Sequence, residues 1–367
     1  MCMTPDGLPL VGPLLQNHNY WVALGFFDEL GSAVGVGKFL AEWIAEKEPP
    51  FELAEIEPER FRSWADREVY SNYYAEDRPL ALRPSGRPTV RVSGAHGPLM
   101  NHGAKMEKYC FSLLFHNGAI FVSVEREYRL ITEKCAIIDL SFLSIIEVRG
   151  KMAEQFLNYV LAKRAPEAGK AIYSCMLTPT GKILSQMKVM RHNMLNSFLL
   201  VSGAEQEARN LRWLNFTSNE NKFFAEVTNV SRFLSTLSLV GPKAFEIMKK
   251  VTPANMSYEA FPHMSSKPIK IGKVPAIVCR MSFTGEPGFE IYHNRAETLR
   301  VYDELMTAGK AFGIKDAGWE ALNILRTEKG MKFPEYEVRL SVRLFLVLIV
   351  FILLARFSAH CSRHVNG

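Results

Sequence analysis

The sequence predicts an α+β protein, and three observations favour that fold class. Hydrophobic residues make up 48% and charged residues 22% of the 367 residues, ordinary values for a globular chain with a large core. Apolar runs of strand length are interspersed with amphipathic segments of helix length. These segments do not follow the strict strand–helix–strand repeat of a parallel sheet, which favours α+β over a doubly wound fold.

The first predicted element is the run NHNYWVAL at residues 17–24, read as a buried strand because it is short and apolar. The glycine-punctuated stretch 35–37 precedes a predicted helix in KFLAEWIAEK, with Trp43 on its apolar face. Residues 48–50, EPP, end this helix. A strand, a glycine turn and a helix together present a helix N-terminus to an anionic group.

Residues 51–120 are irregular and predict a connecting segment, whereas the pattern becomes regular again from residue 124. Strand-length apolar runs lie at 135–140, 145–148, 174–177, 183–191, 198–201, 235–240, 274–283 and 289–292. Predicted helices lie at 125–134, after Gly150, and at 205–214, 244–250, 297–308 and 320–328. We find no internal repeat.

Composition argues against several classes of protein. The net charge is +6, but residues 339–367 hold four Arg and no Asp or Glu, so 1–338 carry only +2, which argues against a nucleic-acid partner. The six cysteines form no CxxC pair and the nine histidines form no HxH or HxxxH cluster, so no metal site is expected. Leu344–Ala355 is apolar over 12 residues, whereas a membrane span needs about 20, so a buried segment is favoured over a tail anchor.

Several motifs, taken in order along the chain, resemble one family, the flavin- and folate-dependent dimethylglycine dehydrogenase family. Its folate half is similar to the glycine-cleavage T-protein, and sarcosine dehydrogenase and the regulatory subunit of pyruvate dehydrogenase phosphatase share the layout. The motifs are TPDGLPLVGP, NYWVALGF, GVGKFLAEWI, EPPFELAEIEPERF, GRPTVRVSG, CMLTPTGKI, SGAEQEARNLRW, SLVGPKAFEIMKKV, FTGEPGFEIY and LRTEKG.

The resemblance implies a division of the chain into four parts. Residues 1–60 would be the end of an FAD-dependent oxidoreductase domain, and 61–123 a connecting segment. Residues 124–338 would be an incomplete T-protein-like folate-binding domain, followed by a divergent apolar tail at 339–367. In the family, FAD oxidises an N-methyl carbon of dimethylglycine, tetrahydrofolate captures it, and sarcosine is released. The resemblance also implies a mitochondrial matrix location.

The flavin side of the resemblance is incomplete. By position, the turn that touches the flavin would be Phe26, Phe27, Asp28, Glu29, Leu30 and Gly31. The two carboxylates there would oppose a reduced, anionic flavin, so a solvated acidic loop is the favoured interpretation. The GxGxxG fingerprint that holds the FAD pyrophosphate does not occur in the sequence. We therefore expect a fragment that is inactive as an oxidoreductase.

The folate side matches the family more fully. Thr284–Glu290 reads TGEPGFE, and the resemblance places Gln186, Phe283, Glu290, Ile291 and Tyr292 against tetrahydrofolate. A carboxylate at Glu290 would accept two hydrogen bonds from the pterin ring amide and amine. Phe283 replaces the family's usual tyrosine but keeps a ring face for stacking.

Candidate catalytic groups are few. Gln186 stands where the family carries an acidic residue, and an amide cannot act as a general base. Asp139, in the IDLS motif, is the other carboxylate that the resemblance places near the folate. A catalytic role and a turn cap both remain open for it. Arg326 and Glu328 lie two residues apart on a predicted helix, point different ways and are expected to be structural.

Three functions therefore remain open. The first is a dimethylglycine dehydrogenase-like enzyme that acts on dimethylglycine, with sarcosine dehydrogenase as the variant. The second is a regulatory module that keeps the architecture without the chemistry, which Gln186 and the missing fingerprint favour. A free-standing aminomethyltransferase is the third, and the flavin-like segment at 4–60 argues against it.

Overall fold

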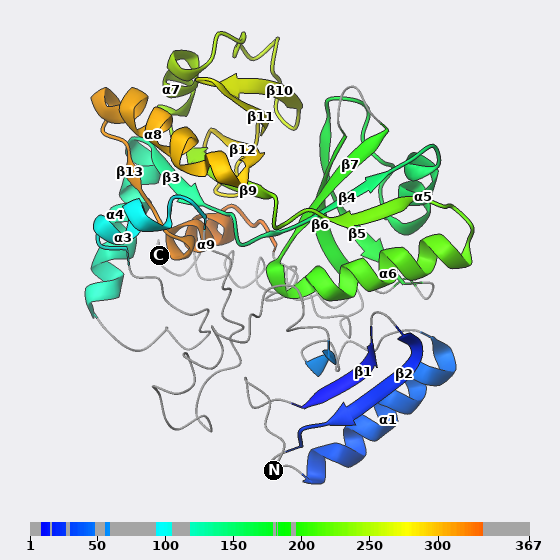
Figure 1. The fold of residues 1–367 in the computed structure, drawn as a ribbon. Helices are drawn as coiled ribbons and strands as arrows, with labels where there is room; N and C mark the ends of the chain where they lie inside the picture. The colour runs from blue at the N-terminus through cyan, green and yellow to red at the C-terminus, as the bar shows by residue number, and fades with distance from the viewer. Residues whose placement is uncertain are drawn as a thin grey trace, which may run out of the picture.

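The computed structural model describes residues 9–14, 17–26, 30–47, 56–58, 93–104, 118–178, 181, 183–191 and 196–332, and all structural statements concern these. They form an N-terminal hairpin with one helix, and two larger β-sheets flanked by helices (Figure 1). The N-terminal unit lies beside helix α6 of the second sheet in Figure 1.

The N-terminal unit consists of β1 (Leu10–Leu14), β2 (Asn17–Leu24) and α1 (Leu30–Glu46). The two strands are antiparallel, and Val11 and Trp43 are the buried residues of their small core. The predicted strand at 17–24 is confirmed, but it is only partly covered, since Tyr20 is 58% exposed. One helix cannot cover both faces of a two-stranded sheet, which explains the exposure.

The first large sheet has six strands in the order β10-β11-β12-β9-β3-β13. All neighbours are antiparallel except β13, which runs parallel to β3. The strands are β3 (Ala136–Asp139), β9 (Leu234–Val240), β10 (Ser266–Ile271), β11 (Val274–Cys279), β12 (Gly288–Asn294) and β13 (Lys315–Asp316).

Helices cover both faces of this sheet. One face packs against α3 (His96–Asn101), α7 (Ala244–Val251) and α8 (Thr298–Gly309), in a core that includes Phe261 and Phe289. Part of the other face packs against α4 (Gly118–Glu133) and α9 (Trp319–Glu328). Helices α4, α7, α8 and α9 each turn an apolar side toward the sheet, as expected for the amphipathic helices that the sequence predicted there.

The second sheet has five antiparallel strands in the order β5-β6-β7-β4-β8. They are β4 (Ser144–Arg149), β5 (Ala171–Leu177), β6 (Ile183–Arg191), β7 (Ser197–Ser202) and β8 (Glu226–Asn229). Helices α5 (Ala153–Val160) and α6 (Glu207–Glu220) bury one face. The opposite face meets the six-stranded sheet in a shared core that contains Met190, Val201, Cys279 and Tyr292.

The predicted mixture of antiparallel strands and helices is confirmed, and most boundaries agree within a few residues. Sequence reasoning missed α3 and the strands β1, β8, β10 and β13. The strand β10 reads SKPIKI, in which lysines and a proline alternate with buried residues, so no continuous apolar run marks it. Helix α4 begins at Gly118 rather than 125.

In the described part of the chain, no helix combines the length and hydropathy needed to cross a membrane. The apolar run Leu344–Ala355 lies outside the described residues, as do the tail at 339–367 and most of the segment at 61–123.

Candidate functional site

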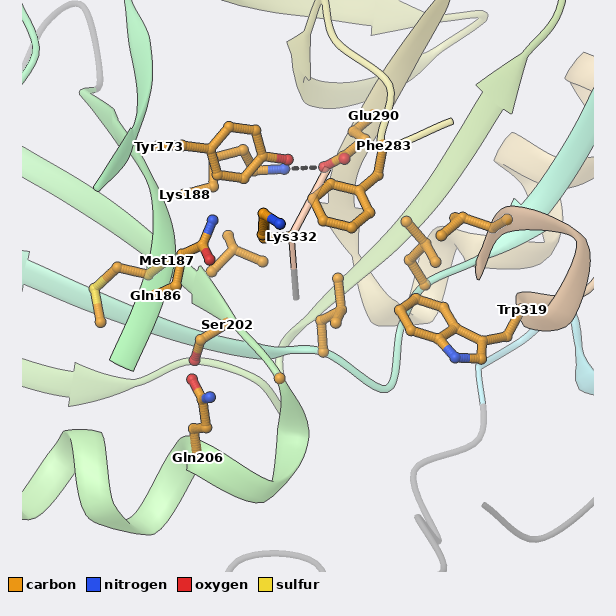
Figure 2. Close-up of a pocket in the computed structure, with 15 residues that line it drawn as sticks. Tyr173, Gln186, Met187, Lys188, Ser202, Gln206, Phe283, Glu290, Trp319 and Lys332 are labelled. Carbon is orange, nitrogen blue, oxygen red and sulfur yellow. Dashed lines mark hydrogen bonds and ion pairs between the residues drawn. The ribbon is translucent and has the colours of Figure 1, made fainter. Parts of the chain in front are cut away.

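A cavity lies where the two sheets meet helix α9 (Figure 2). Strands β5, β6 and β7 form one wall, and β12, the segment before it and α9 form the other. Its lining residues are Leu140, Leu143, Tyr173, Gln186, Met187, Lys188, Val201, Ser202, Gly203, Gln206, Phe283, Glu290, Trp319, Leu322 and Lys332. Residues far apart in the sequence therefore converge here.

Three of the five predicted folate contacts, Gln186, Phe283 and Glu290, line this cavity. Figure 2 shows Gln186 on one side and Phe283 with Glu290 on the other. The Phe283 ring lies 5.9 Å, centroid to centroid, from that of Tyr173, at 58° between planes. The aromatic rings of Tyr173, Phe283 and Trp319 and the amides of Gln186 and Gln206 thus share the cavity with a carboxylate.

The other two predicted contacts lie elsewhere. Strand β12 points successive side chains to opposite faces of its sheet. Ile291 therefore lies in the core beneath α7 and α8, and the structure does not bring it to the cavity. Tyr292 is on the same face as Glu290 but is fully buried in the core between the sheets, and only its hydroxyl reaches Glu290.

The polar centre of the cavity is an ion pair between Glu290 and Lys188, which sequence reasoning missed. Lys188 Nζ contacts Glu290 Oε2, and both side chains are only 4% exposed. Nζ also contacts the Tyr292 hydroxyl, which itself donates to Glu290 Oε2. A buried charge is tolerated when it is paired and hydrogen-bonded, and this network satisfies that need. The sequence indicated this pair only through the lysine that interrupts the mostly apolar strand ILSQMKVMR.

Burial shapes the chemistry of the neighbouring groups. It raises the pKa of the Tyr173 and Tyr292 hydroxyls well above the usual value, and the nearby Glu290 carboxylate raises both further. Burial also raises the pKa of the Cys279 thiol to about 12. At neutral pH these groups are therefore protonated, so both tyrosines are hydrogen-bond donors and Cys279 is no thiolate nucleophile.

Asp139 faces away from the cavity. It accepts a hydrogen bond from Ser93 Oγ at 2.5 Å and another from the Ser141 backbone N–H at 3.0 Å. It ends β3 on the face that carries Ile137 into the α7–α8 core. The geometry is that of a capped turn, which favours that interpretation over a catalytic role.

The predicted flavin turn is described only in part. Phe26 packs against the small core around Trp43, and Leu30 and Gly31 begin α1. Phe27, Asp28 and Glu29 lie outside the described residues.

The N-terminal unit contacts α6 through Trp43, and Glu57, which follows this unit in the chain, pairs with two arginines of α6. Arg212 Nη1 lies 2.8 Å from Glu57 Oε2, and its guanidinium lies 5.0 Å from the centroid of the Trp43 ring. Arg209 Nε lies 3.9 Å from Glu57 Oε1. This unit and the second sheet are therefore in contact through specific side chains.

Arg326 and Glu328 have structural partners, in line with expectation. Arg326 is buried and donates to Asn323 Oδ1 and to the Met331 carbonyl, which holds the turn after α9. Glu328 is exposed and accepts a hydrogen bond from the Tyr128 hydroxyl. Among the described residues, no three His, Cys, Asp or Glu side chains gather as a metal site would require.

Comparison with known proteins agrees with this architecture. The profile of the GCVT N-terminal domain family matches residues 95–345. Human mitochondrial dimethylglycine dehydrogenase is 32% identical over 360 residues, which cover 90% of this chain and 40% of the human protein. The mouse mitochondrial pyruvate dehydrogenase phosphatase regulatory subunit is 28% identical over 364 residues, covering 90% of this chain and 41% of its own length.

Among solved structures, the glycine cleavage system aminomethyltransferase T from Bartonella henselae aligns with a TM-score of 0.50 and 23% identity. The alignment covers 57% of this chain and 55% of that one, and indicates a shared fold. The chain spans about two fifths of the length of the two curated relatives named above.

Proposed function

Because the chain belongs to the GCVT N-terminal domain family, we propose that its cavity binds the pterin ring of tetrahydrofolate. The observation that carries the proposal is the convergence of Gln186, Phe283 and Glu290 on one cavity. They come from β6, from the segment after β11 and from β12, and only the fold brings them together.

The residues present fit such a ligand. A pterin offers a flat ring with an amide and an amine as adjacent donors. The Phe283 ring would supply an apolar face for the ring, and the Glu290 carboxylate an acceptor for a donor. Gln186 would add an amide, which both donates and accepts. When bound, tetrahydrofolate supplies the nitrogen atoms that accept a one-carbon unit.

At the finer level, we propose that the chain is the folate-binding part of a dimethylglycine dehydrogenase-like protein. There a flavin would oxidise an N-methyl group of dimethylglycine to leave sarcosine, and folate would take the carbon; sarcosine as substrate is the variant. The similarity to human dimethylglycine dehydrogenase over 90% of this chain supports this choice. The names of the similar proteins also support a mitochondrial location.

A specific observation favours a second candidate, a folate-binding module without catalysis. Glu290 is the only carboxylate among the described cavity-lining residues, and it is paired with Lys188. Gln186 cannot take a proton in its place. The similarity to the phosphatase regulatory subunit is consistent with this candidate.

Calorimetric titration of the full chain with 5-formyltetrahydrofolate, a stable analogue, tests folate binding. Loss of a stacking ring costs about 1–3 kcal/mol, so Phe283→Ala should weaken binding roughly 5- to 150-fold. Phe233→Ala is the matched control, because that ring is 68% exposed and does not line the cavity. No binding by the wild type, or equal affinities for wild type and Phe283→Ala, would count against the proposal.

A coupled assay separates the two candidates. The chain would be mixed with tetrahydrofolate and a one-carbon donor such as formaldehyde, and methylene-tetrahydrofolate formation compared with the uncatalysed rate. Acceleration above that rate supports an enzyme. Folate binding without acceleration supports the module.

A further inference from the structure

The cavity carries its own cation at the position where a folate ligand needs an acceptor. Lysine is almost never fully buried unless it is paired, and Lys188 is 3% exposed. Its partner is the same Glu290 that the proposed function assigns to the ligand. Lys188 and the ligand would therefore both use the Glu290 carboxylate as their partner.

The two oxygens of Glu290 are not equivalent. Oε2 is contacted by Lys188 Nζ and accepts from the Tyr292 hydroxyl. Oε1 receives no hydrogen bond from the residues that the structure describes. Two parallel donors, such as the amide and amine of a pterin, need both oxygens of a carboxylate. The family resemblance implied that two-oxygen arrangement, whereas the structure leaves one oxygen for it.

The titratable groups of β5, β11 and β12 beside the ion pair do not relieve this competition. Tyr173 and Tyr292 face the ion pair as protonated hydroxyls, because burial and Glu290 raise the pKa of both. Neither can replace Glu290 as the anionic partner of Lys188. Cys279, opposite Glu290 on the paired strand β11, is also kept neutral by a pKa of about 12. Lys188 thus depends on Glu290 for its neutralisation.

We propose, building on the proposed function, that Lys188 is a specificity-determining residue that competes with the ligand for Glu290. It holds Oε2, so that a pterin must either bind through one oxygen or displace the ammonium group. The cavity therefore binds a paired-donor ring more weakly than its carboxylate would otherwise allow. Tetrahydrofolate and its analogues are the ligands for which Lys188 sets the affinity.

Two substitutions at this one position shift the affinity in opposite directions. Lys188→Met removes the ammonium group from Oε2, which keeps its hydrogen bond from Tyr292 but regains a position for a second donor, so a ligand can use both Glu290 oxygens. Lys188→Arg introduces a planar fork that occupies both oxygens of a carboxylate. Affinity for 5-formyltetrahydrofolate should rise at least about tenfold in the first variant, which equals about 1.4 kcal/mol, and fall at least about tenfold in the second.

The experiment is calorimetric titration of the full chain with 5-formyltetrahydrofolate, with every variant in the same buffer. Lys188→Met/Glu290→Gln should lose the gain, because the freed carboxylate is then absent. Lys270→Met, an exposed lysine on β10, is the matched control and should bind as the wild type does. Circular dichroism confirms that each variant is folded, and Lys188→Arg decides the question if Lys188→Met does not fold.

The possible outcomes distinguish a failure of this inference from a failure of the proposed function. Tighter binding by Lys188→Met together with weaker binding by Lys188→Arg supports the competition. Where wild-type binding is too weak to measure, measurable binding by Lys188→Met with none by Lys188→Arg supports it. Measurable but equal affinities in wild type and Lys188→Met overturn the inference and leave the proposed function standing. No binding by any of the proteins overturns both.

Discussion

Glu290→Gln should destabilise the fold much more than the loss of an ordinary salt bridge. Glu290 and Lys188 are each 4% exposed, so the substitution leaves an ammonium group buried without its counter-ion. Breaking a buried pair from one side costs about 3–5 kcal/mol, because the remaining charge stays desolvated. Lys188→Met should cost a similar amount for the same reason.

The double variant Lys188→Met/Glu290→Gln should recover most of that loss. It removes both charges, and replacing a buried ion pair by apolar or neutral groups is often close to neutral for stability. The two substitutions should therefore be strongly non-additive, with a coupling energy of about 2 kcal/mol or more. Urea unfolding of the wild type, the two single variants and the double variant, followed by circular dichroism and tryptophan fluorescence, completes the double-mutant cycle.

The exposed pair Arg149–Glu226 provides the matched control. Its Nη2–Oε1 distance is 2.6 Å, but the two side chains are 54% and 56% exposed, so water compensates for the loss of either partner. Glu226→Gln should change the urea midpoint little. If Glu290→Gln shifted the midpoint no more than Glu226→Gln, the premise that burial makes the Lys188 pair indispensable would be refuted.

Two further predictions concern the scaffold. Gly241 has φ +123°, and a Cβ there would lie 2.7 Å from the Lys134 carbonyl oxygen, so Gly241→Ala should lower the free energy of unfolding by about 2–3 kcal/mol. Gly97→Ala, on the exposed side of α3 with open space around it, should be neutral or stabilising in the same urea assay; equal losses would contradict this. Burial lowers the pKa of His293, so the folded state resists protonation, and stability should fall as the pH drops below about 6.5. His293→Gln should remove that part of the decline in melting temperature between pH 7 and 5, and an unchanged profile would exclude His293 as its source.

Much of the fold followed from local patterns in the sequence. The hairpin of β5 and β6 was predicted from two apolar runs around a glycine turn, and the helix α8 from a spacing of apolar residues that puts Tyr302 and Leu305 inside. Leu299, which the same spacing places on the inward face, is 43% exposed. Periodicity is a property of neighbouring residues, and it survives folding because each element buries one face. The family resemblance also implied that Phe283 and Glu290 would share a site, and both line the cavity.

The tertiary structure alone decided which groups meet in that site. Lys188 and Glu290 lie on strands of different sheets, so their pairing depends on how the two sheets face each other. The same geometry turned Ile291 and Asp139 to the opposite face of the six-stranded sheet, away from the cavity. A motif fixes the order of residues along the chain, but the direction of each side chain depends on strand register and sheet packing. The partner of a buried charge is therefore decided by contacts between distant segments, which no local pattern in the sequence encodes.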